Sequence, residues 1–170
     1  MAKRAGSSRT RTRSRPRHTR ELPVRYTIDA SVFVNAFNPH EDGHDASLEL
    51  LTAIYDAGDP VIVPALALPE IASAVARATD DTAGALGYAA AIGNLPHITL
   101  VSLTPAAGRD AAALAARHRL RGADAVYAWT ARRYGTTLVS RDDQQRIRAA
   151  AIVACLTPEE ALRQRDPSLF

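Results

Sequence analysis

Residues 136–145 read TTLVSRDDQQ, a short apolar run that ends in two adjacent aspartates. Residues 137–139 have the composition of a buried strand, and residues 123–134 before them form a predicted helix that ends at Gly135. The order of a helix and then a short buried strand is typical of parallel β-sheets, in which a crossover returns the chain to the same edge.

Short apolar strands alternate with helices along the rest of the chain. The predicted strands are residues 24–28, 61–63, 98–101, 137–139 and 152–155, and the predicted helices are residues 30–37, 43–56, 66–78, 82–94, 104–118, 123–134 and one that begins at a capping box over 157–160. Continuous apolar strands between helices indicate a sheet that is buried on both faces. The expected fold class is α/β, a three-layer sandwich with a central, mostly parallel five-stranded sheet covered by helices.

The charge of the chain is unevenly distributed. Residues 1–20 hold eight of the 21 Lys and Arg residues and no acid, so residues 21–170 carry 13 basic residues against all 18 acids, a net charge of −5. We therefore predict a disordered basic tail over residues 1–22 and one folded domain over 23–170. The tail suits the attraction of nucleic acid, and a solubilising leader without that role is the alternative.

Cysteine content and hydropathy bear on the cellular compartment of the protein. Cys155 is the single cysteine, which excludes an internal disulfide, and an apolar strand position argues against Cys155 as a nucleophile. No stretch approaches the ~18 apolar residues of a membrane span, and no apolar segment follows the basic start as in a secretory signal. We expect a cytoplasmic protein without a membrane partner.

Acidic residues follow or neighbour the carboxyl ends of the predicted strands. Asp29 follows the first strand, Asp142 and Asp143 follow the fourth, Glu70 lies on the helix after the second, and Asp124 opens the helix over 123–134. Because sites in open parallel sheets form at the carboxyl ends of the strands, these acids are expected to converge. Converging carboxylates repel one another unless a cation joins them, and all-oxygen ligands suit Mg²⁺ or Mn²⁺.

Each acid also has a purely structural interpretation. Asp29 and Asp124 can cap or charge the start of a helix, and Asp142 and Asp143 can form a turn. Glu70 fits such a role less well, because its helix, VPALALPEIASAVARA, is apolar on most sides and therefore predicted to be buried. A buried arginine is the structural alternative as a partner for Glu70.

Four motifs resemble those of the PIN-domain nucleases. They are IDASV with Asp29, LPEIASAV with Glu70, RGADAVYAWTA with Asp124 and LVSRDDQ with Asp142, and together they span about residues 24–156. The spacing is most similar to that of the VapC-type toxins of type II toxin–antitoxin pairs. Asp143 is additional to the pattern, so the resemblance leaves open whether Asp142 or Asp143 is the ligand. The basic tail is not part of the pattern.

The resemblance implies a PIN-like nuclease domain over residues 23–170 that hydrolyses RNA phosphodiester bonds. Asp29, Glu70, Asp124 and Asp142 would be the catalytic and metal-binding residues, with Mg²⁺ or Mn²⁺ as the cofactor. It also implies a homodimer and a cognate antitoxin protein. Possible contacts to RNA phosphates are then Ser31, Ser140, Arg121 and Arg141, with Arg77 and Arg146 as further candidates.

Three other functions remain open at this stage. A PIN fold can serve as a catalytically silent RNA-binding or scaffolding module, or as a housekeeping nuclease without an antitoxin. A phosphatase or receiver domain also places a first-strand aspartate near a late aspartate pair. That class needs a lysine near the phosphoryl group, and the only lysine here is Lys3 in the tail.

Overall fold

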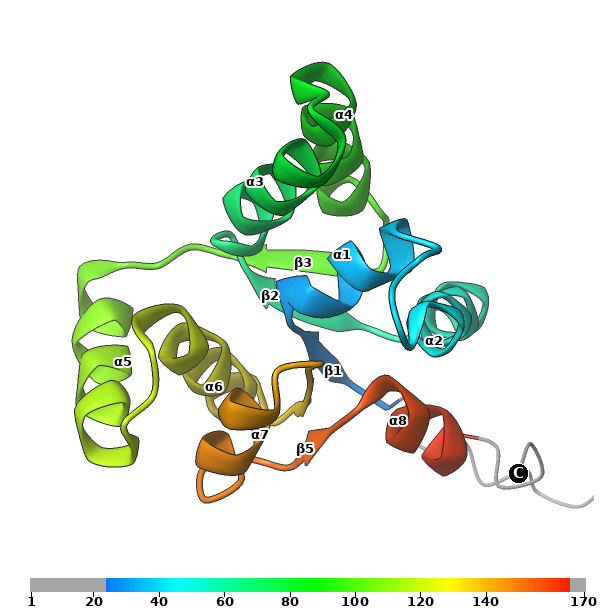
Figure 1. The fold of residues 1–170 in the computed structure, drawn as a ribbon. Helices are drawn as coiled ribbons and strands as arrows, with labels where there is room; N and C mark the ends of the chain where they lie inside the picture. The colour runs from blue at the N-terminus through cyan, green and yellow to red at the C-terminus, as the bar shows by residue number, and fades with distance from the viewer. Residues whose placement is uncertain (1–23, 166–170) are drawn as a thin grey trace, which may run out of the picture.

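The computed structural model of the protein describes residues 24–165, in which helices alternate with short strands (Figure 1). The strands are β1 (Tyr26–Ile28), β2 (Val61–Pro64), β3 (Ile98–Val101), β4 (Thr137–Val139) and β5 (Cys155–Leu156). The helices are α1 (Ala30–Phe37), α2 (His44–Ala57), α3 (Ala67–Thr79), α4 (Thr82–Gly93), α5 (Pro105–His118), α6 (Gly122–Tyr134), α7 (Asp143–Ala149) and α8 (Pro158–Arg165). The predicted basic tail lies outside the described residues.

The five strands form one sheet in the order β3-β2-β1-β4-β5, and all of its strand pairs are parallel. Strand β1 lies at the centre, where Tyr26, Thr27 and Ile28 are all buried. Ile28 is in register with Val139 of β4, so β1 and β4 end at the same edge. The α/β fold with a five-stranded sheet is confirmed, and the sheet is fully rather than mostly parallel.

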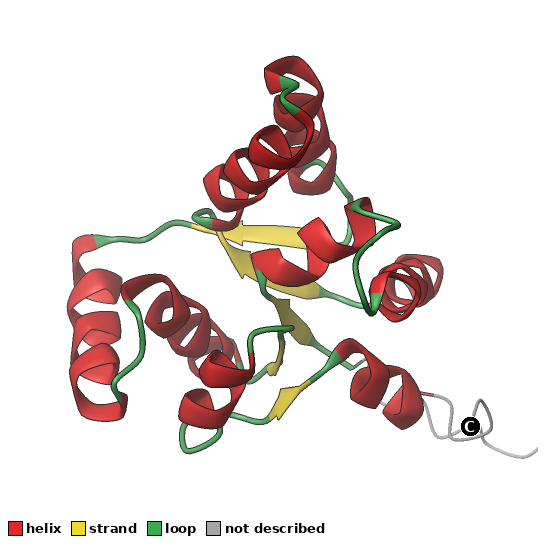
Figure 2. Ribbon diagram, in the orientation of Figure 1, coloured by secondary structure: helices red, strands yellow, loops and turns green. Residues whose placement is uncertain are grey.

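Helices cover both faces of the sheet. Helix α6 packs on β1, β2 and β4, with α5 against its outer side, while α1 and α2 lie on the opposite face (Figures 1 and 2). The core between these layers contains the fully buried side chains of Tyr26, Tyr127, Phe33 and Leu50. Burial of these large side chains is the main stabilising contribution, at about 1.5–3 kcal/mol each.

Most helix boundaries lie where the sequence signals predict them. Thr104 caps α5 by accepting a hydrogen bond from the Ala107 amide at 3.2 Å, and Pro105 occupies the first helical position. The capping box at α8 is reciprocal: the Glu160 amide donates to Thr157 Oγ1 at 3.1 Å, and the Thr157 amide donates to Glu160 Oε2 at 2.8 Å.

The predictions fail after β4. The chain forms α7 where no helix was expected, because Asp142 caps a polar segment without an apolar period. The strand predicted over 152–155 begins only at Cys155, since residues 151–153 turn after the helix end. Cys155 is therefore partly exposed at a strand start rather than mid-strand, although burial still raises the pKa of its thiol to about 11.

Within residues 24–165, no helix is both long and apolar enough to cross a membrane.

Candidate active site

The site is built where β1 and β4 end side by side. Asp29 follows β1 and caps α1, and Asp142 follows β4, separated from it by two residues, and caps α7. The Asp29 amide donates to the carbonyl of Val139 at 2.9 Å, which fixes the two strand ends together. Glu70 and Asp124 lie in the first turns of α3 and α6. The capping interpretation is thus correct for Asp29, and Asp142, which was interpreted as a turn residue, caps a helix as well.

Asp29 is the most enclosed acid of the group, with 8% of its surface exposed. Its Oδ2 accepts hydrogen bonds from the Ser31 amide at 3.0 Å and from Ser140 Oγ at 3.4 Å, and its Oδ1 accepts one from Gln145 Nε2 at 3.3 Å. Burial raises the pKa of Asp29, and these hydrogen bonds offset part of the rise. The fold therefore holds a carboxylate in place at a cost in stability.

The two predicted hydroxyl residues connect the loops that follow β1 and β4. Ser31 Oγ lies 3.5 Å from Ser140 Oγ and accepts a hydrogen bond from the Arg141 amide at 3.1 Å. Ser140 Oγ also accepts a hydrogen bond from the Asp142 amide at 3.0 Å. Both hydroxyls thus position the acids that flank them, and their contact with RNA phosphate stays a prediction.

Glu70 is held by a tyrosine and not by an arginine. Tyr127 on α6 donates its hydroxyl proton to Glu70 Oε2 at 2.7 Å. Burial raises the pKa of Glu70, and the nearby charges of Asp29 and Asp124 raise it further. The prediction that α3 is buried all round is wrong, since Arg77 and other residues on one side of it are exposed. Glu70 is therefore half-buried at the rim of the site.

Asp124 lies within the electrostatic influence of the other acids. Burial raises its pKa first, followed by the charges of Asp142 and Asp29, while Arg121 acts in the opposite direction. The charge of Asp29 raises the pKa of both Glu70 and Asp124, and the charge of Asp124 also raises that of Glu70, so these carboxylates form one cluster. The sequence-based expectation that acids spread over more than a hundred positions converge is consistent with this arrangement.

The structure distinguishes Asp142 from Asp143. Asp142 Oδ1 accepts the Gln145 amide at 3.0 Å, and Oδ2 pairs with Arg121 Nη1 at 3.0 Å. The Asp143 side chain is 78% exposed and pairs with Arg146 one helical turn on. Asp142 is therefore the acid that belongs to the cluster by position.

The other candidate arginines already have local partners. Arg141 forms an ion pair with Glu159 at 2.8 Å. Its guanidinium also packs closely against Gly43, where an added Cβ would lie within 2.3 Å of it. Arg146 donates to the Ser140 carbonyl at 2.7 Å, and Arg77 donates to Ser73. Of this group, Arg121 is the arginine in direct contact with a cluster acid.

The carboxylate oxygens of the cluster are suitable ligands for a hard divalent cation, but the side-chain conformations in this structure do not bring them together around one. Across residues 24–165, no three His, Cys, Asp or Glu side chains stand close enough together to hold a metal ion. Glu70 is turned toward Tyr127 and Asp142 toward Arg121, so both would rotate to join Asp29 and Asp124. An all-carboxylate oxygen set in which neighbouring charges raise the pKa of Glu70 and Asp124 suits Mg²⁺ or Mn²⁺.

A cavity of about 600 Å³ opens beside Asp29 and Glu70. Its walls include Ser31 and Arg77, and apolar side chains of α1 and α3 supply much of the remaining surface: Val34, Leu66, Pro69 and Ala74. Two acids of the cluster thus share the wall of this groove with apolar side chains. Such a groove admits an extended chain whose charged part reaches the carboxylates.

Sequence reasoning missed the roles of Tyr127 and Gln145. Tyr127 stands three residues after Asp124, which places it one helical turn away on the same side, and this spacing was a usable signal. Gln145 is fully buried, donates to Asp29, and leaves its Oε1 without a hydrogen-bond partner. No signal identified Gln145, because the helix that carries it was not predicted.

Comparison with solved structures returns proteins of similar fold. VapC20 of Mycobacterium tuberculosis, described as a Sarcin-Ricin loop cleaving toxin, aligns with a TM-score of 0.62 and 21% identity over 75% of this chain and 96% of that chain. VapBC2 of Rickettsia felis bound to promoter DNA aligns with a TM-score of 0.59 and 14% identity over 79% and 98%. FitAcB of Neisseria gonorrhoeae aligns with a TM-score of 0.57 and 20% identity over 78% and 97%.

At these identities the likeness establishes the fold. A comparison with curated protein sequences finds no match. The family model of the PIN domain matches residues 26–151, which include β1, β4 and all the acids of the cluster. This chain therefore belongs to the PIN-domain family.

Proposed function

We propose that this protein is a Mg²⁺- or Mn²⁺-dependent endoribonuclease and the toxin of a VapBC-type toxin–antitoxin pair. The observation that supports the proposal is the buried Asp29 at the end of the central strand, with Glu70 and Asp124 close enough for its charge to raise the pKa of both. Carboxylates with pKa values shifted by burial and by one another's charge are concentrated at functional sites.

The side chains divide the work of hydrolysis between them. A bound cation would lower the pKa of a water ligand and stabilise the charge that develops on the phosphate. Asp29 and Asp124 would be its firmest ligands, with Glu70 and Asp142 completing the set. Tyr127 orients Glu70, and Gln145 orients Asp29, as partners beyond the ligands do in metal sites.

The proposed chemistry determines which chemical groups the RNA products carry at their new ends. A water nucleophile attacks phosphorus without the RNA 2′-hydroxyl, so the 5′ product fragment ends in a 3′-hydroxyl and the 3′ fragment begins with a 5′-phosphate. A 2′,3′-cyclic phosphate at the cut would contradict this mechanism. Arg121 lies beside the cluster and is the nearest cation for holding a backbone phosphate.

The first test is cleavage of a mixed RNA pool by the purified protein with Mg²⁺, with Mn²⁺ and with EDTA. Asp124→Asn removes one charge of the cluster, and Asp143→Asn removes one exposed charge outside it. We expect metal-dependent cleavage that the first variant loses and the second retains. Equal activity in wild type and Asp124→Asn would refute the site.

The apolar side chains in the wall of the groove beside Asp29 support an antitoxin as the partner. The solved structures of similar fold include complexes described as VapBC and FitAcB. We expect a small upstream reading frame whose product co-purifies with this chain as a complex of homodimers and inhibits RNA cleavage. A gene with no such neighbour would favour a housekeeping nuclease.

A further inference from the structure

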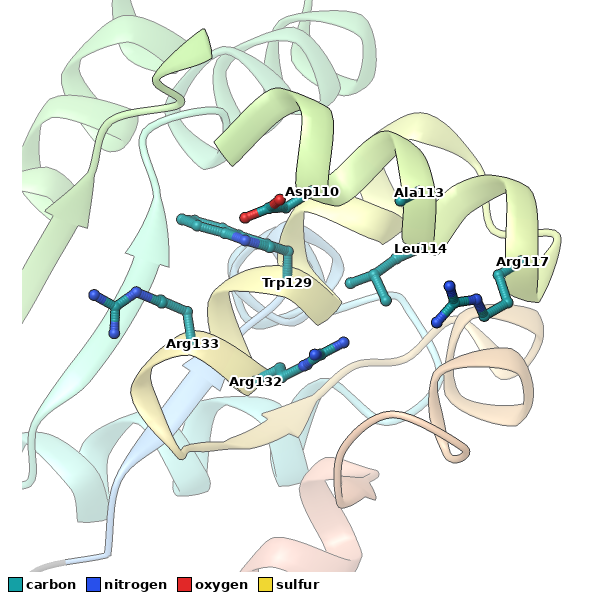
Figure 3. Close-up of a pocket in the computed structure, with 7 residues that line it drawn as sticks. All are labelled: Asp110, Ala113, Leu114, Arg117, Trp129, Arg132 and Arg133. Carbon is teal, nitrogen blue, oxygen red and sulfur yellow. The ribbon is translucent and has the colours of Figure 1, made fainter. Parts of the chain in front are cut away.

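A second cavity lies between α5 and α6, apart from the acidic cluster. It encloses about 450 Å³, and its walls include Trp129, Leu114, Asp110 and three arginines, Arg117, Arg132 and Arg133 (Figure 3). Trp129 and the last two arginines belong to the C-terminal half of α6, while Asp110, Leu114 and Arg117 belong to α5. None of these residues has a role in the proposed cleavage.

The charge of this cavity favours an anionic ligand. Three guanidinium groups and one carboxylate line it, in a folded region whose formal charge is negative. Arg117 and Arg132 are exposed, and within the described part of the chain no carboxylate forms an ion pair with either of them. Unpaired arginines that converge on a cavity are well suited to bind phosphate groups.

The tryptophan in the cavity wall favours a ligand that has an aromatic ring over a simple anion. Trp129 is the single tryptophan of the sequence and is only partly buried, with its indole ring lying along the cavity in Figure 3. A partly exposed indole beside arginines is the combination on which unpaired nucleobases stack. Leu114 adds an apolar side chain to the wall of the cavity.

Asp110 favours RNA over an acidic peptide as the ligand of this cavity. Its carboxylate stands next to the Trp129 ring in Figure 3, where it would repel the carboxylates of a peptide. A nucleobase instead offers amino and imino N–H groups at its edge, which a carboxylate accepts. One base on Trp129, with its edge at Asp110 and its phosphates at Arg117 and Arg132, uses the carboxylate and two of the three arginines of the cavity.

The cavity lies within reach of the cleavage site. Helix α6 carries Asp124 in its first turn, Trp129 five residues later and Arg132 eight residues later. At about 1.5 Å per residue these side chains lie ~7.5 and ~12 Å along the helix axis from Asp124. An RNA strand held at the acids therefore needs only a few nucleotides to pass over α6 to the cavity.

We propose that the cavity between α5 and α6 binds an unpaired nucleotide of single-stranded RNA outside the cleavage site. This inference rests on the proposed ribonuclease function and specifies where its substrate is gripped. The bound base stacks on Trp129, and the arginines hold its flanking phosphates. The cavity thereby selects RNA that is single-stranded at a short, fixed distance from the cut.

The single tryptophan makes a site-specific test available. Full-length protein in EDTA, which prevents cleavage, is titrated with a single-stranded RNA 12-mer while Trp129 fluorescence is recorded. We expect saturable quenching, with binding about tenfold or more weaker in Arg117→Ala/Arg132→Ala. The charge-matched control is Arg25→Ala/Arg109→Ala, which removes two exposed arginines outside the cavity and should change affinity less than twofold.

Three outcomes would overturn the proposal. They are RNA binding without a change in Trp129 fluorescence, equal affinity in the two double variants, and a cavity variant that converts a dimer to a monomer in sedimentation, which would make the cavity a protein interface. Cleavage assays distinguish an effect at the cavity from an effect at the active site. The cavity variant should raise KM for the 12-mer with kcat retained, whereas Asp124→Asn should lose cleavage and keep the fluorescence response.

Discussion

Replacing Asp29 by asparagine should make the metal-free protein more stable while abolishing cleavage. Asp29 is 8% exposed, and burial raises its pKa, so its ionised form is disfavoured in the folded state. Asparagine has nearly the same shape and is an equally good helix N-cap, so it can still accept the Ser31 amide. The substitution thus removes the charge and keeps the cap.

The hydrogen bonds around Asp29 allow this exchange. An asparagine oxygen in the place of Oδ2 keeps the bonds from Ser31 and Ser140, and its NH₂ group then faces the side chain of Gln145. Gln145 Oε1 is buried without a partner, so rotating that amide by half a turn supplies the acceptor. A buried ion costs several kcal/mol, and three weakened hydrogen bonds offset part of this. We expect a net gain of ~1–2 kcal/mol.

Thermal and urea unfolding in EDTA measure the gain and its pH dependence. For a chain of this length, ~1–2 kcal/mol corresponds to an increase in Tm of ~2–8 °C. Because the folded-state pKa of Asp29 is raised, the folded wild type binds the proton more tightly than the unfolded chain, and wild-type stability increases as pH falls through that range. The advantage of Asp29→Asn should therefore be largest at pH 8 and shrink toward acid pH.

A destabilised Asp29→Asn protein at pH 8 would refute this reasoning. It would mean that the hydrogen bonds to Asp29 outweigh the cost of burying its charge. A gain that is unchanged from pH 8 to pH 4 would also refute it, because the effect would then not depend on ionisation. Added Mg²⁺ serves as the control, since it should raise the Tm of wild type more than that of the variant.

Three further changes test other parts of the structure. Tyr127→Phe removes the hydroxyl that orients Glu70 and should weaken metal-dependent cleavage ~10–100-fold, measured by titrating Mg²⁺ against rate. Arg165→Ala leaves the mostly buried Asp59 carboxylate without its partner and should cost ~3–5 kcal/mol in urea unfolding, chiefly by loosening α8. Deleting residues 1–22 should reduce the salt dependence of RNA binding, and an unchanged slope would make the tail a spectator.

The parts of the fold that follow from local chemistry could be predicted. The helices α5 and α8 begin at Thr104 and Thr157 because side-chain caps satisfy amides that the helix cannot. Strand β1 could be located because its three residues, Tyr26, Thr27 and Ile28, are all of types that favour strands. Helix α7 could not, because its seven residues are mostly polar and its one signal, the cap at Asp142, also reads as a turn.

The site could be predicted as a set of residues but not as a set of contacts. Parallel strands deliver Asp29 and Asp142 to one edge, so their neighbourhood follows from topology alone. The side chains that hold the acids come from distant parts of the sequence. Tyr127 binds Glu70 from 57 positions away, and Gln145 binds Asp29 from 116 positions away. Such pairings depend on how helices pack on the sheet, which no local pattern encodes.

The strand-end acids combine a structural role with a proposed chemical one, and this decides how the site should be tested. Asp29 and Asp142 each accept an amide hydrogen bond that begins a helix, so alanine at either position would lose ~1 kcal/mol of capping as well as the charge. Lost activity in an alanine variant would then not distinguish a missing ligand from a displaced loop. Asparagine keeps the cap, and so a loss of cleavage in Asp142→Asn with unchanged unfolding would assign the loss to the charge. The same exchange at Asp143, whose carboxylate contacts the exposed side of α7, should leave cleavage intact.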